Sequence, residues 1–354
     1  MPRTLSNGHF MQSRHTKLRI GIIGAGSIVR KRHLPALNQI DDVKIVGVCN
    51  SSYESSEKFC SDVLPDAKPY ANWAELLAEP DVDIIWIGTP PYLHATIAVS
   101  ALEAGKHVFC QARMAMNLTE AEEMCAALQR HPHLVTMLCP PPHGLRGSRL
   151  IQKLLADEYV GRPHHVRLHS FTGDYLDPDT PPHWRQRDEY SGLNVLTLGI
   201  YAEVLQRWFG RISSLVAHRK TITPLRQTYE VRIPDMVTVL CTFASGTEGV
   251  LEFSGIAPFP PPDRLELYGS RGRLSYDFSK DVITGAQLGD PAPSLIQIPP
   301  ELEQIWRVEA DFIAAVRSPG GILPQPGFGE GLEYMKVVQA VADSIDQGRE
   351  IEIA

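Results

Sequence analysis

Short apolar runs alternate with segments of helical periodicity over roughly the first 140 residues. Near-continuous apolar runs at 18–23, 43–49, 83–88, 107–110 and 134–139 predict buried parallel strands. Residues 27–38, 54–63, 73–77 and 95–104 predict the helices between them, the first one bent around Pro35. The alternation predicts an α/β domain over residues 17–143, with a doubly wound parallel sheet.

The pattern changes from about residue 144 onward. Turn-separated strands are predicted at 164–171, 215–221, 237–243, 249–254, 265–269 and 274–276, which is typical of an antiparallel sheet. Helices are predicted at 145–156, 191–210, 305–317 and 331–346. Residues 144–354 are therefore expected to form an α+β domain with a large, mostly antiparallel open sheet. Residues 1–16 are polar and charged and predict a flexible segment.

A glycine-rich turn follows the first strand. Gly24 and Gly26 let the chain turn tightly and let its backbone approach a ligand. The helix then begins near Ser27, so the amides of Ser27 and Ile28 are expected to bind a pyrophosphate. The third glycine of the G-x-G-x-x-G pattern is replaced by Val29, a packing position. The turn predicts a dinucleotide site.

The carboxyl ends of the later strands supply the other candidate cofactor residues, because ligands lie beyond these ends in a doubly wound sheet. Asn50 stands where such folds place an acidic residue to hold the ribose, and it leaves NAD and NADP equally possible. His94 either faces the cofactor or caps its helix. The remaining candidates, one to three positions beyond a strand, are Ser51, Thr89, Pro90, Gln111 and Ala112.

Composition narrows the class of protein. The net charge of −7 and the pI near 6.0 give no basic field for nucleic acid or an acidic membrane surface. Six cysteines without C-x-x-C or zinc spacing predict reduced, buried thiols and no metal site. No apolar stretch is long enough to cross a bilayer. A cytoplasmic protein is expected.

Several stretches in order resemble the Gfo/Idh/MocA family, which includes glucose-fructose oxidoreductase and inositol 2-dehydrogenase. They are GIIGAGSIVRKRHLPAL at 21–37, TPPYLHATIAVSALEAGKHVFC at 89–110, LELYGSRGRLSYD at 265–277, EADFIAAV at 309–316 and EGLEYMKVVQAVADSIDQGREI at 330–351. The resemblance implies an N-terminal Rossmann domain, a C-terminal domain with a large open sheet, and NAD(P) bound between them. The implied reaction is hydride transfer to or from a sugar or cyclitol. The resemblance also implies a homodimer or homotetramer formed through the second sheet.

The sequence departs from that family where the proton chemistry takes place. Members usually carry a Glu-Lys-Pro motif after the AGKHV strand, and here it reads Gln111-Ala112-Arg113, with Ala112 in place of the lysine. The family's Asp and His on the substrate-domain helix align with Thr197 and Tyr201. All three usual catalytic side chains are absent.

Another group must then move the proton. One hypothesis makes Tyr201 the acid and base, with Arg113 favouring the phenolate; His143 and His183 are the competing groups. Substrate-binding residues implied by the resemblance or by position are Arg113, His143, Trp184, Arg185, Asn194, Thr197 and Tyr201. The leading function is an NAD(P)-dependent sugar, cyclitol or glycoside oxidoreductase. Its alternatives are an enzyme that uses tightly bound NAD(P) and transient oxidation for elimination or glycoside cleavage, and a regulatory protein that binds NAD(P) or a sugar.

Overall fold

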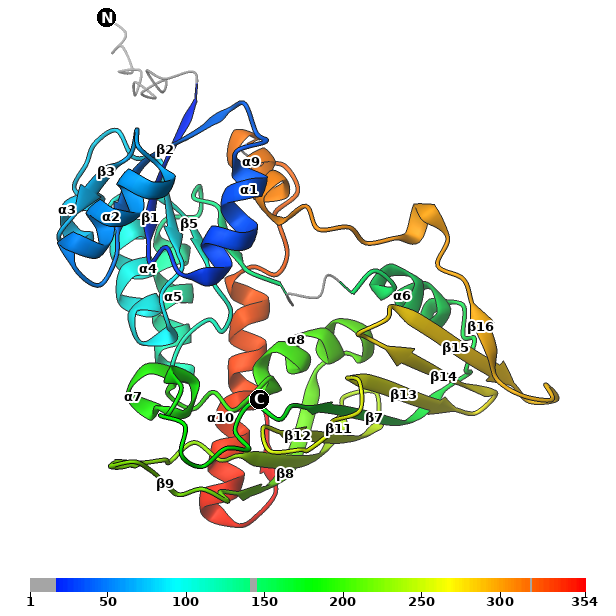
Figure 1. Cartoon of the computed structure of the whole chain (residues 1–354). Helices are drawn as coiled ribbons and strands as arrows, with labels where there is room; N and C mark the ends of the chain where they lie inside the picture. Colours follow the sequence, from blue (N-terminus) through cyan, green and yellow to red (C-terminus); the bar gives the residue numbers. More distant parts are fainter. Residues whose placement is uncertain (1–16, 141–144, 319) are drawn as a thin grey trace, which may run out of the picture.

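The computed structural model describes residues 17–140, 145–318 and 320–354. Each of its two large sheets carries its own helices, and the sheets lie one above the other (Figure 1). Helix α10 (Phe328–Gln347) connects them, because it contacts α5 (Leu118–Arg130) beside the first sheet and α8 (Leu198–Phe209) beside the second. The expected boundary near residue 143, the segment 1–16 and His143 all lie outside the described residues.

The first sheet is parallel and has the strand order β3-β2-β1-β4-β5-β6. This order confirms the predicted doubly wound α/β sheet. Its strands are β1 (Leu18–Ile23), β2 (Val43–Cys49), β3 (Lys68–Tyr70), β4 (Ile84–Ile87), β5 (His107–Cys110) and β6 (Thr136–Leu138). β3 was not predicted, because three residues that include a proline carry no strand periodicity.

Side-chain caps fix where several helices around this sheet begin. Ser52, Asn72 and Asn117 each accept a hydrogen bond from the backbone N–H three residues later. They start α2 (Tyr53–Val63), α3 (Trp73–Leu77) and α5, respectively. Helix α4 (His94–Glu103) has no such cap. The sequence pattern predicted α2, α3 and α4 but missed α5.

The helix after the glycine turn is irregular, as expected, but not at the expected place. A π-helical turn covers Val29–His33, and α1 (Leu34–Leu37) follows it. The Leu34 N–H donates to the Val29 carbonyl, five residues back, instead of four. The π-helical turn therefore lies before Pro35 and is not centred on it. Pro35 itself, which has no N–H to donate, lies in the first turn of α1.

Helix α9 (Val308–Arg317) follows the second sheet in the chain but packs against the first unit. Its Phe312 side chain contacts Trp86 and Phe109, whose rings stack with centroids 3.7 Å apart on β4 and β5. These buried rings explain the return of the chain, because α9 covers apolar surface that would otherwise face water.

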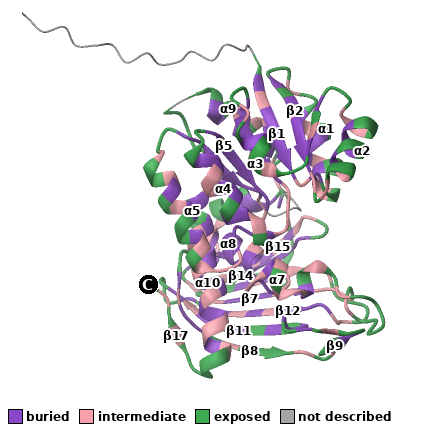
Figure 2. Cartoon of the chain, turned by 90° about the vertical axis from the view of Figure 1, so that its left-hand side faces the viewer, coloured by how far each residue is buried: buried purple, intermediate pink, exposed green. Residues whose placement is uncertain are grey.

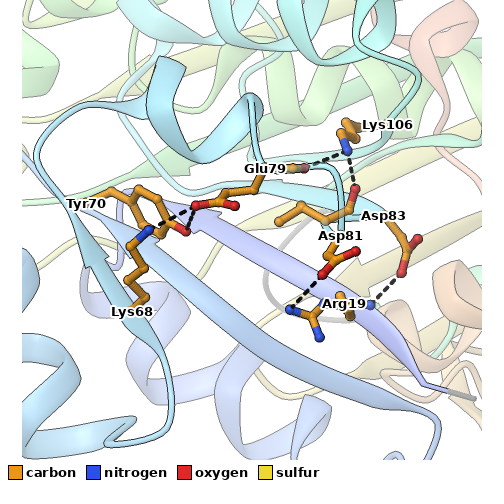
Figure 3. A network of polar contacts seen from close by, with 8 residues as sticks. Arg19, Lys68, Tyr70, Glu79, Asp81, Asp83 and Lys106 are labelled. Atoms are coloured by element: carbon orange, nitrogen blue, oxygen red, sulfur yellow. Dashed lines mark hydrogen bonds and ion pairs between the residues drawn. The ribbon is translucent and has the colours of Figure 1, made fainter. Parts of the chain in front are cut away.

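A polar network ties the amino ends of the central strands together (Figure 3). The Arg19 backbone N–H donates to Asp83 Oδ2 at 2.8 Å, and Lys106 Nζ donates to the Glu79 carbonyl at 3.0 Å. The Glu79 carboxylate accepts a hydrogen bond from the Tyr70 hydroxyl. Arg19, Asp83 and Lys106 lie at the amino ends of β1, β4 and β5. Ligands of such sheets bind at the opposite, carboxyl ends, so this network is not a candidate site.

The second sheet has the strand order β16-β15-β14-β13-β7-β12-β11-β8-β17. Only β7 and β12 run parallel, which confirms a large, mostly antiparallel sheet. The strands are β7 (Pro163–Phe171), β8 (Ile212–Lys220), β11 (Met236–Phe243), β12 (Glu248–Ser254), β13 (Arg264–Gly269), β14 (Gly272–Asp277), β15 (Val282–Gln287), β16 (Ser294–Ile296) and β17 (Ile351–Glu352). β9 (Leu225–Arg226) and β10 (Tyr229–Glu230) form a separate ribbon.

Helices cover one face of this sheet and leave the other open. Helix α6 (Ser148–Ala156) contacts α8, and α10 packs on β8. Along β11, Val237 and Val239 are buried, whereas Met236 and Leu240 on the opposite face are exposed. Figure 2 shows this difference as exposed positions along β8 and β11 and mostly buried strands in the first sheet. Association of copies through the open face stays a prediction.

No helix among the described residues is both long and apolar enough to cross a membrane.

Candidate active site

The glycine turn lies against the carboxyl end of β4. Gly24 has φ +87°, and a Cβ there would lie 2.6 Å from the Thr89 nitrogen. A Cβ on Gly88 would lie 2.2 Å from the Gly24 carbonyl oxygen. Gly26, by contrast, is exposed, and a Cβ there would meet nothing closer than 3.9 Å. Glycine is therefore required for the close approach at Gly24 and Gly88, while the space beside Gly26 is left for a ligand.

The neighbouring candidates fit a dinucleotide. Ser27 is exposed at the start of the helix, and Ile28 follows it half-buried. Thr89 Oγ1 is buried at the end of β4 and has no hydrogen-bond partner among the described residues. Half-buried Pro90 follows it. First-turn amides and an unpaired hydroxyl beside an open turn suit a pyrophosphate and its riboses.

Asn50 also holds the turn in place. Its Oδ1 accepts a hydrogen bond from the Ala25 N–H at 2.7 Å, and its Nδ2 donates to the Ser55 carbonyl at 3.2 Å. One amide hydrogen is left for a ribose hydroxyl. Ser51, the next residue, is exposed.

His94 is fully buried between the ends of β4 and β5. Its Nε2 lies 2.7 Å from the Thr89 carbonyl, and its Nδ1 lies 2.9 Å from the Arg113 carbonyl. Burial lowers its pKa, so the ring is neutral at pH 7 and donates to only one of these oxygens. Both ring nitrogens face the protein backbone, so the contacts correspond neither to a helix cap nor to a cofactor contact.

Gln111 belongs to a buried chain of polar groups that reaches α9. Its Nε2 contacts His33 Nε2, and His33 Nδ1 lies 2.5 Å from the Glu309 carboxylate. The Trp306 indole N–H donates to the same carboxylate at 2.9 Å. With its proton on Nδ1, His33 donates to Glu309 and accepts from Gln111, so both contacts are satisfied by one tautomer. This chain of polar groups fixes Gln111, the residue directly after β5.

Arg113 extends from the end of β5 toward the second sheet. The Ala112–Arg113 peptide bond is cis, and Ala112 is half-buried. The Arg113 side chain is 3% exposed, and its Nη1 donates to the Leu196 carbonyl at 3.0 Å. Its Nε and Nη2 have no partner among the described residues. Burial, followed by repulsion from Arg185, lowers its pKa to about 10, which leaves it charged at neutral pH.

A cavity of about 500 Å³ opens where Arg113 meets the second sheet. The end of β5, the ends of β7 and β12, the loop before α7 (Asp188–Ser191) and the start of α8 all contribute to its wall. Its lining residues are Arg113, Ser170, Thr172, Asp174, Tyr175, Thr180, Pro181, His183, Arg185, Gln186, Leu196, Thr197, Ile200, Arg226 and Ser254. Its volume suits a small ligand, and its walls carry several hydrogen-bonding groups.

Three of the predicted residues lie at the 3₁₀ turn Trp184–Gln186: Trp184 and Arg185 belong to the turn, and His183 caps it. His183 Nδ1 accepts a hydrogen bond from the Arg185 N–H at 3.2 Å, so its neutral ring carries the proton on Nε2. Burial and the nearby Arg185 lower the pKa of His183. The Arg185 guanidinium lies over the Trp184 ring, 4.3 Å from its centroid. Trp184 therefore orients Arg185 without lining the cavity itself.

Tyr201 lies behind the cavity wall. Its hydroxyl donates to Asp263 Oδ2 at 2.6 Å, and Ser170 Oγ donates to the same oxygen at 2.8 Å. Thr197, which does line the cavity, donates to Ser170 at 2.9 Å. Burial, reinforced by the Asp263 carboxylate, raises the pKa of Tyr201 far above its usual range. The hypothesis that Arg113 favours a Tyr201 phenolate is wrong, because the neighbour of the phenol is a carboxylate.

Two family models match the chain in succession. Residues 18–138 match an oxidoreductase family with an NAD-binding Rossmann fold, and residues 148–275 match the GFO/IDH/MocA C-terminal domain. The chain belongs to the Gfo/Idh/MocA family. The resemblance noted in the sequence is confirmed, and the first unit is an NAD-binding Rossmann fold.

Similar proteins include enzymes that act on sugars and cyclitols. The dTDP-3,4-didehydro-2,6-dideoxy-alpha-D-glucose 3-reductase of Saccharopolyspora spinosa is 24% identical over 94% of this chain and 97% of its own. The myo-inositol 2-dehydrogenase of Thermotoga maritima is 26% identical over 73% and 75%, respectively. A levoglucosan dehydrogenase in complex with NADH and L-sorbose superimposes with a TM-score of 0.84 and 21% identity, covering 96% of this chain and 99% of its own. That structure shows the shared fold.

The remaining predicted residue in the described chain of this Gfo/Idh/MocA protein, Asn194, lies away from the cavity. It is fully buried, and its Nδ2 donates to the carbonyls of Ala115 at 2.8 Å and Ser191 at 2.7 Å. Its contacts join the segment before α8 to the segment after β5. They support a positioning role instead of the predicted contact with substrate.

Tyr175 is one of the cavity residues that the sequence interpretation missed, and it is a titratable one. Its backbone is fixed on both sides, because its N–H donates to the Gly255 carbonyl at 2.8 Å and its carbonyl accepts from Arg226 Nη2 at 2.6 Å. Burial raises the pKa of the half-buried phenol, while Arg185 and Arg113 act in the opposite direction. A tyrosine in a loop of Gly, Asp, Pro and Thr carries no motif. Only the fold brings it to the two arginines.

Proposed function

We propose that this protein is an NAD(P)-dependent oxidoreductase that transfers a hydride to or from a carbinol carbon of a sugar, cyclitol or glycoside. The family relationship supports the reaction class. The observation that carries the proposal is that Arg113, three residues beyond β5, lines the same cavity as Tyr175, His183 and Arg185. A binding-only regulator does not need a phenol and an imidazole in one cavity, so catalysis is preferred to the regulatory alternative.

The bound nicotinamide would supply the hydride acceptor or donor, and the turn at Gly24 and Gly26 would hold its pyrophosphate. Substrate oxidation releases one hydride from carbon and one proton from the hydroxyl group. Among the cavity residues, Tyr175 suits the proton step because its phenol lines the cavity together with Arg113 and Arg185. Burial raises the pKa of Tyr175, and the two nearby arginines limit that rise. In the reverse direction the phenol returns that proton to the alkoxide.

His183 suits a different task. Its Nδ1 lone pair is used by the Arg185 N–H, so the neutral ring presents an N–H and not a basic nitrogen. It can donate a hydrogen bond to a substrate oxygen, but it accepts a proton only after that backbone bond is lost. We therefore assign hydrogen-bond donation to His183 and proton transfer to Tyr175.

A screen of sugars, cyclitols and glycosides with NAD and NADP tests the reaction, followed through reduced-nicotinamide absorbance. Once a substrate is found, we expect Tyr175→Phe to lower kcat by about 10²- to 10⁴-fold. Cofactor affinity should change by less than about threefold, because the phenol acts only on the substrate. Tyr190→Phe is the matched control, since Tyr190 packs against Tyr92 and is not part of the cavity wall.

Full turnover by Tyr175→Phe would exclude Tyr175 as the acid and base. A screen without net reduction of NAD or NADP, in a protein that retains nicotinamide through purification, would instead favour transient oxidation with a tightly bound cofactor.

A further inference from the structure

The cavity is positively charged in a protein that is negative as a whole. Three arginines, Arg113, Arg185 and Arg226, line it together with one carboxylate, Asp174, and His183 is neutral at pH 7. The chain itself has a net charge of −7. A local excess of positive charge inside a concave site attracts anions and repels cations.

Arg226 is one of the three arginines, but its terminal nitrogens bind the protein backbone and not a ligand. It is 1% exposed and donates to backbone carbonyls, from Nη1 to Asp177 at 2.6 Å and from Nη2 to Tyr175 at 2.6 Å. These contacts hold the loop that carries Tyr175. The two arginines left for a ligand are Arg113 and Arg185.

Arg113 has hydrogen-bond donors without a partner in the buried interior, where an unpaired polar group lowers stability. Arg113 is only 3% exposed, yet its Nε and Nη2 lack any partner within the described residues. Buried polar groups in folded proteins are normally paired, and a buried charge without a counter-charge is especially unfavourable. Nε and one terminal nitrogen form the fork that binds both oxygens of a carboxylate or phosphate.

Arg185 faces the same space with no ion-pair partner in the described chain. It is exposed where the cavity opens, and the Trp184 ring holds its guanidinium from one side. Asp174 lies near enough to affect it electrostatically, but not within ion-pair distance. Arg113 and Arg185 also repel each other. Two like charges held around a hollow are stabilised when an anion occupies it.

We infer that the substrate of this site carries an oxyanion, a carboxylate or a phosphate monoester on a polyhydroxylated carbon skeleton, bound between Arg113 and Arg185. This inference rests on the proposed function only in taking the cavity as the substrate site. A neutral sugar would leave the buried guanidinium of Arg113 without its counter-charge. An anionic sugar derivative would neutralise it and anchor the reacting carbon beside the end of β5.

The preference for an anion is tested by calorimetric titration of the full chain, saturated with its cofactor, with charged and neutral probes. The probes are D-gluconate for the carboxylate, D-glucose 6-phosphate for the phosphate, and D-sorbitol as the neutral counterpart. We expect at least one anion to bind more than about tenfold more tightly than D-sorbitol, and its affinity to fall as salt is raised. Whichever anion binds more tightly identifies the charged group.

Variants then assign the effect to the two arginines. Arg185→Gln and Arg113→Met should each remove most of the preference for the anion. Arg185 is exposed, so its variant should fold even if Arg113→Met does not. Arg149→Gln, on the exposed surface of α6, is the control and should keep the preference.

The outcomes separate this inference from the proposed function. Equal affinity for D-sorbitol and both anions, no binding of either anion, or an unchanged preference in Arg185→Gln would overturn the inference. Turnover of neutral sugars alone would overturn it while leaving the oxidoreductase proposal in place. Tight, arginine-dependent binding of an anion without any turnover would support it and count against the oxidoreductase.

Discussion

The two ends of this site are built in different ways. At the phosphate end, the turn at Gly24 and Gly26 depends on backbone geometry, with Gly88 and Thr89 at close approach. At the reaction end, the wall is made of side chains from β5, β7, β12, α8 and the loop before α7. A backbone site tolerates few changes, because its shape comes from the main chain. A side-chain site can change individual residues and still keep a polar cavity.

The same difference separates the features that the family shares from those that are particular to this chain. From the resemblance to the family, Ala112, Thr197 and Tyr201 are expected at the positions of its usual catalytic groups. The titratable groups that meet in the cavity come instead from the loop around Tyr175 and from His183 and Arg185. Under the proposed function, the same fold would keep the cofactor site constant while the substrate chemistry uses side chains at other positions.

The substitution with the largest expected effect, Gly24→Ala, changes the phosphate end alone. Gly24→Ala places a Cβ 2.6 Å from the Thr89 nitrogen, so the turn must move. We expect cofactor affinity to fall at least ~100-fold, about 2.7 kcal/mol, in a fluorescence titration with NADH or NADPH. Gly246→Ala is the control. Gly246 has a similar φ of +80° but nothing within 4 Å of its Cβ, so its variant should cost about 1–2 kcal/mol of stability and no cofactor affinity.

Equal cofactor affinity in Gly24→Ala and Gly246→Ala would show that the close approach to β4 is not required for binding.

A smaller effect is expected behind the reaction end. Tyr201→Phe removes the hydroxyl that donates to Asp263, which keeps Ser170 as a donor. We expect the free energy of unfolding to fall by about 1–3 kcal/mol, while turnover stays within about threefold. Chemical denaturation and steady-state kinetics measure the two quantities separately. A large loss of kcat with unchanged stability would restore Tyr201 as the acid and base.

The same variant should change the response to alkali. The folded protein holds the Tyr201 proton more tightly than the unfolded chain, because burial and Asp263 raise its pKa. That contribution to stability is complete below about pH 10 and is lost as pH rises further. Tyr201→Phe should therefore flatten the alkaline fall in stability.

The sequence predicted the parts of the structure that have a local signal. The strands around Ile20 and Val48 and the turn at Gly24 follow from apolar runs and glycine chemistry, and all lie where expected. The return of α9 to the first sheet had no such signal, because Phe312 packs on Trp86 and Phe109 more than 200 residues earlier in the chain.

The reaction end was predictable only in part, for the same reason. The family pattern located Arg113, Arg185 and Thr197, which do line the cavity. It could not predict that Tyr201 would face Asp263, a residue 62 positions away. Nor could it predict that a loop would bring Tyr175 to the arginines. Contacts between distant segments are set by packing, which one sequence does not encode in any local pattern.

The smallest expected effect concerns the adenosine side of the phosphate end, where Asn50→Asp should change the preference between NAD and NADP. Asn50 Oδ1 accepts from the Ala25 N–H, so Asn50→Asp keeps that bond and adds a negative charge at the end of β2. In this fold that position faces the ribose, where NADP carries its extra phosphate. We expect NADP affinity to fall about tenfold, or 1.4 kcal/mol, and NAD affinity to change by less than about threefold. Titration with NADH and NADPH measures both.

Asn38→Asp is the matched control for that substitution. It adds the same charge at the exposed end of α1, away from the end of β2, and should leave both affinities unchanged. If Asn50→Asp shifts the two affinities equally, its effect comes from the lost Nδ2 hydrogen bond to the Ser55 carbonyl and from movement of the turn. If NADP alone weakens, the neutral Asn50 is what allows this chain to accept a 2′-phosphate, and the cofactor choice is set by one side chain on an otherwise backbone-built site.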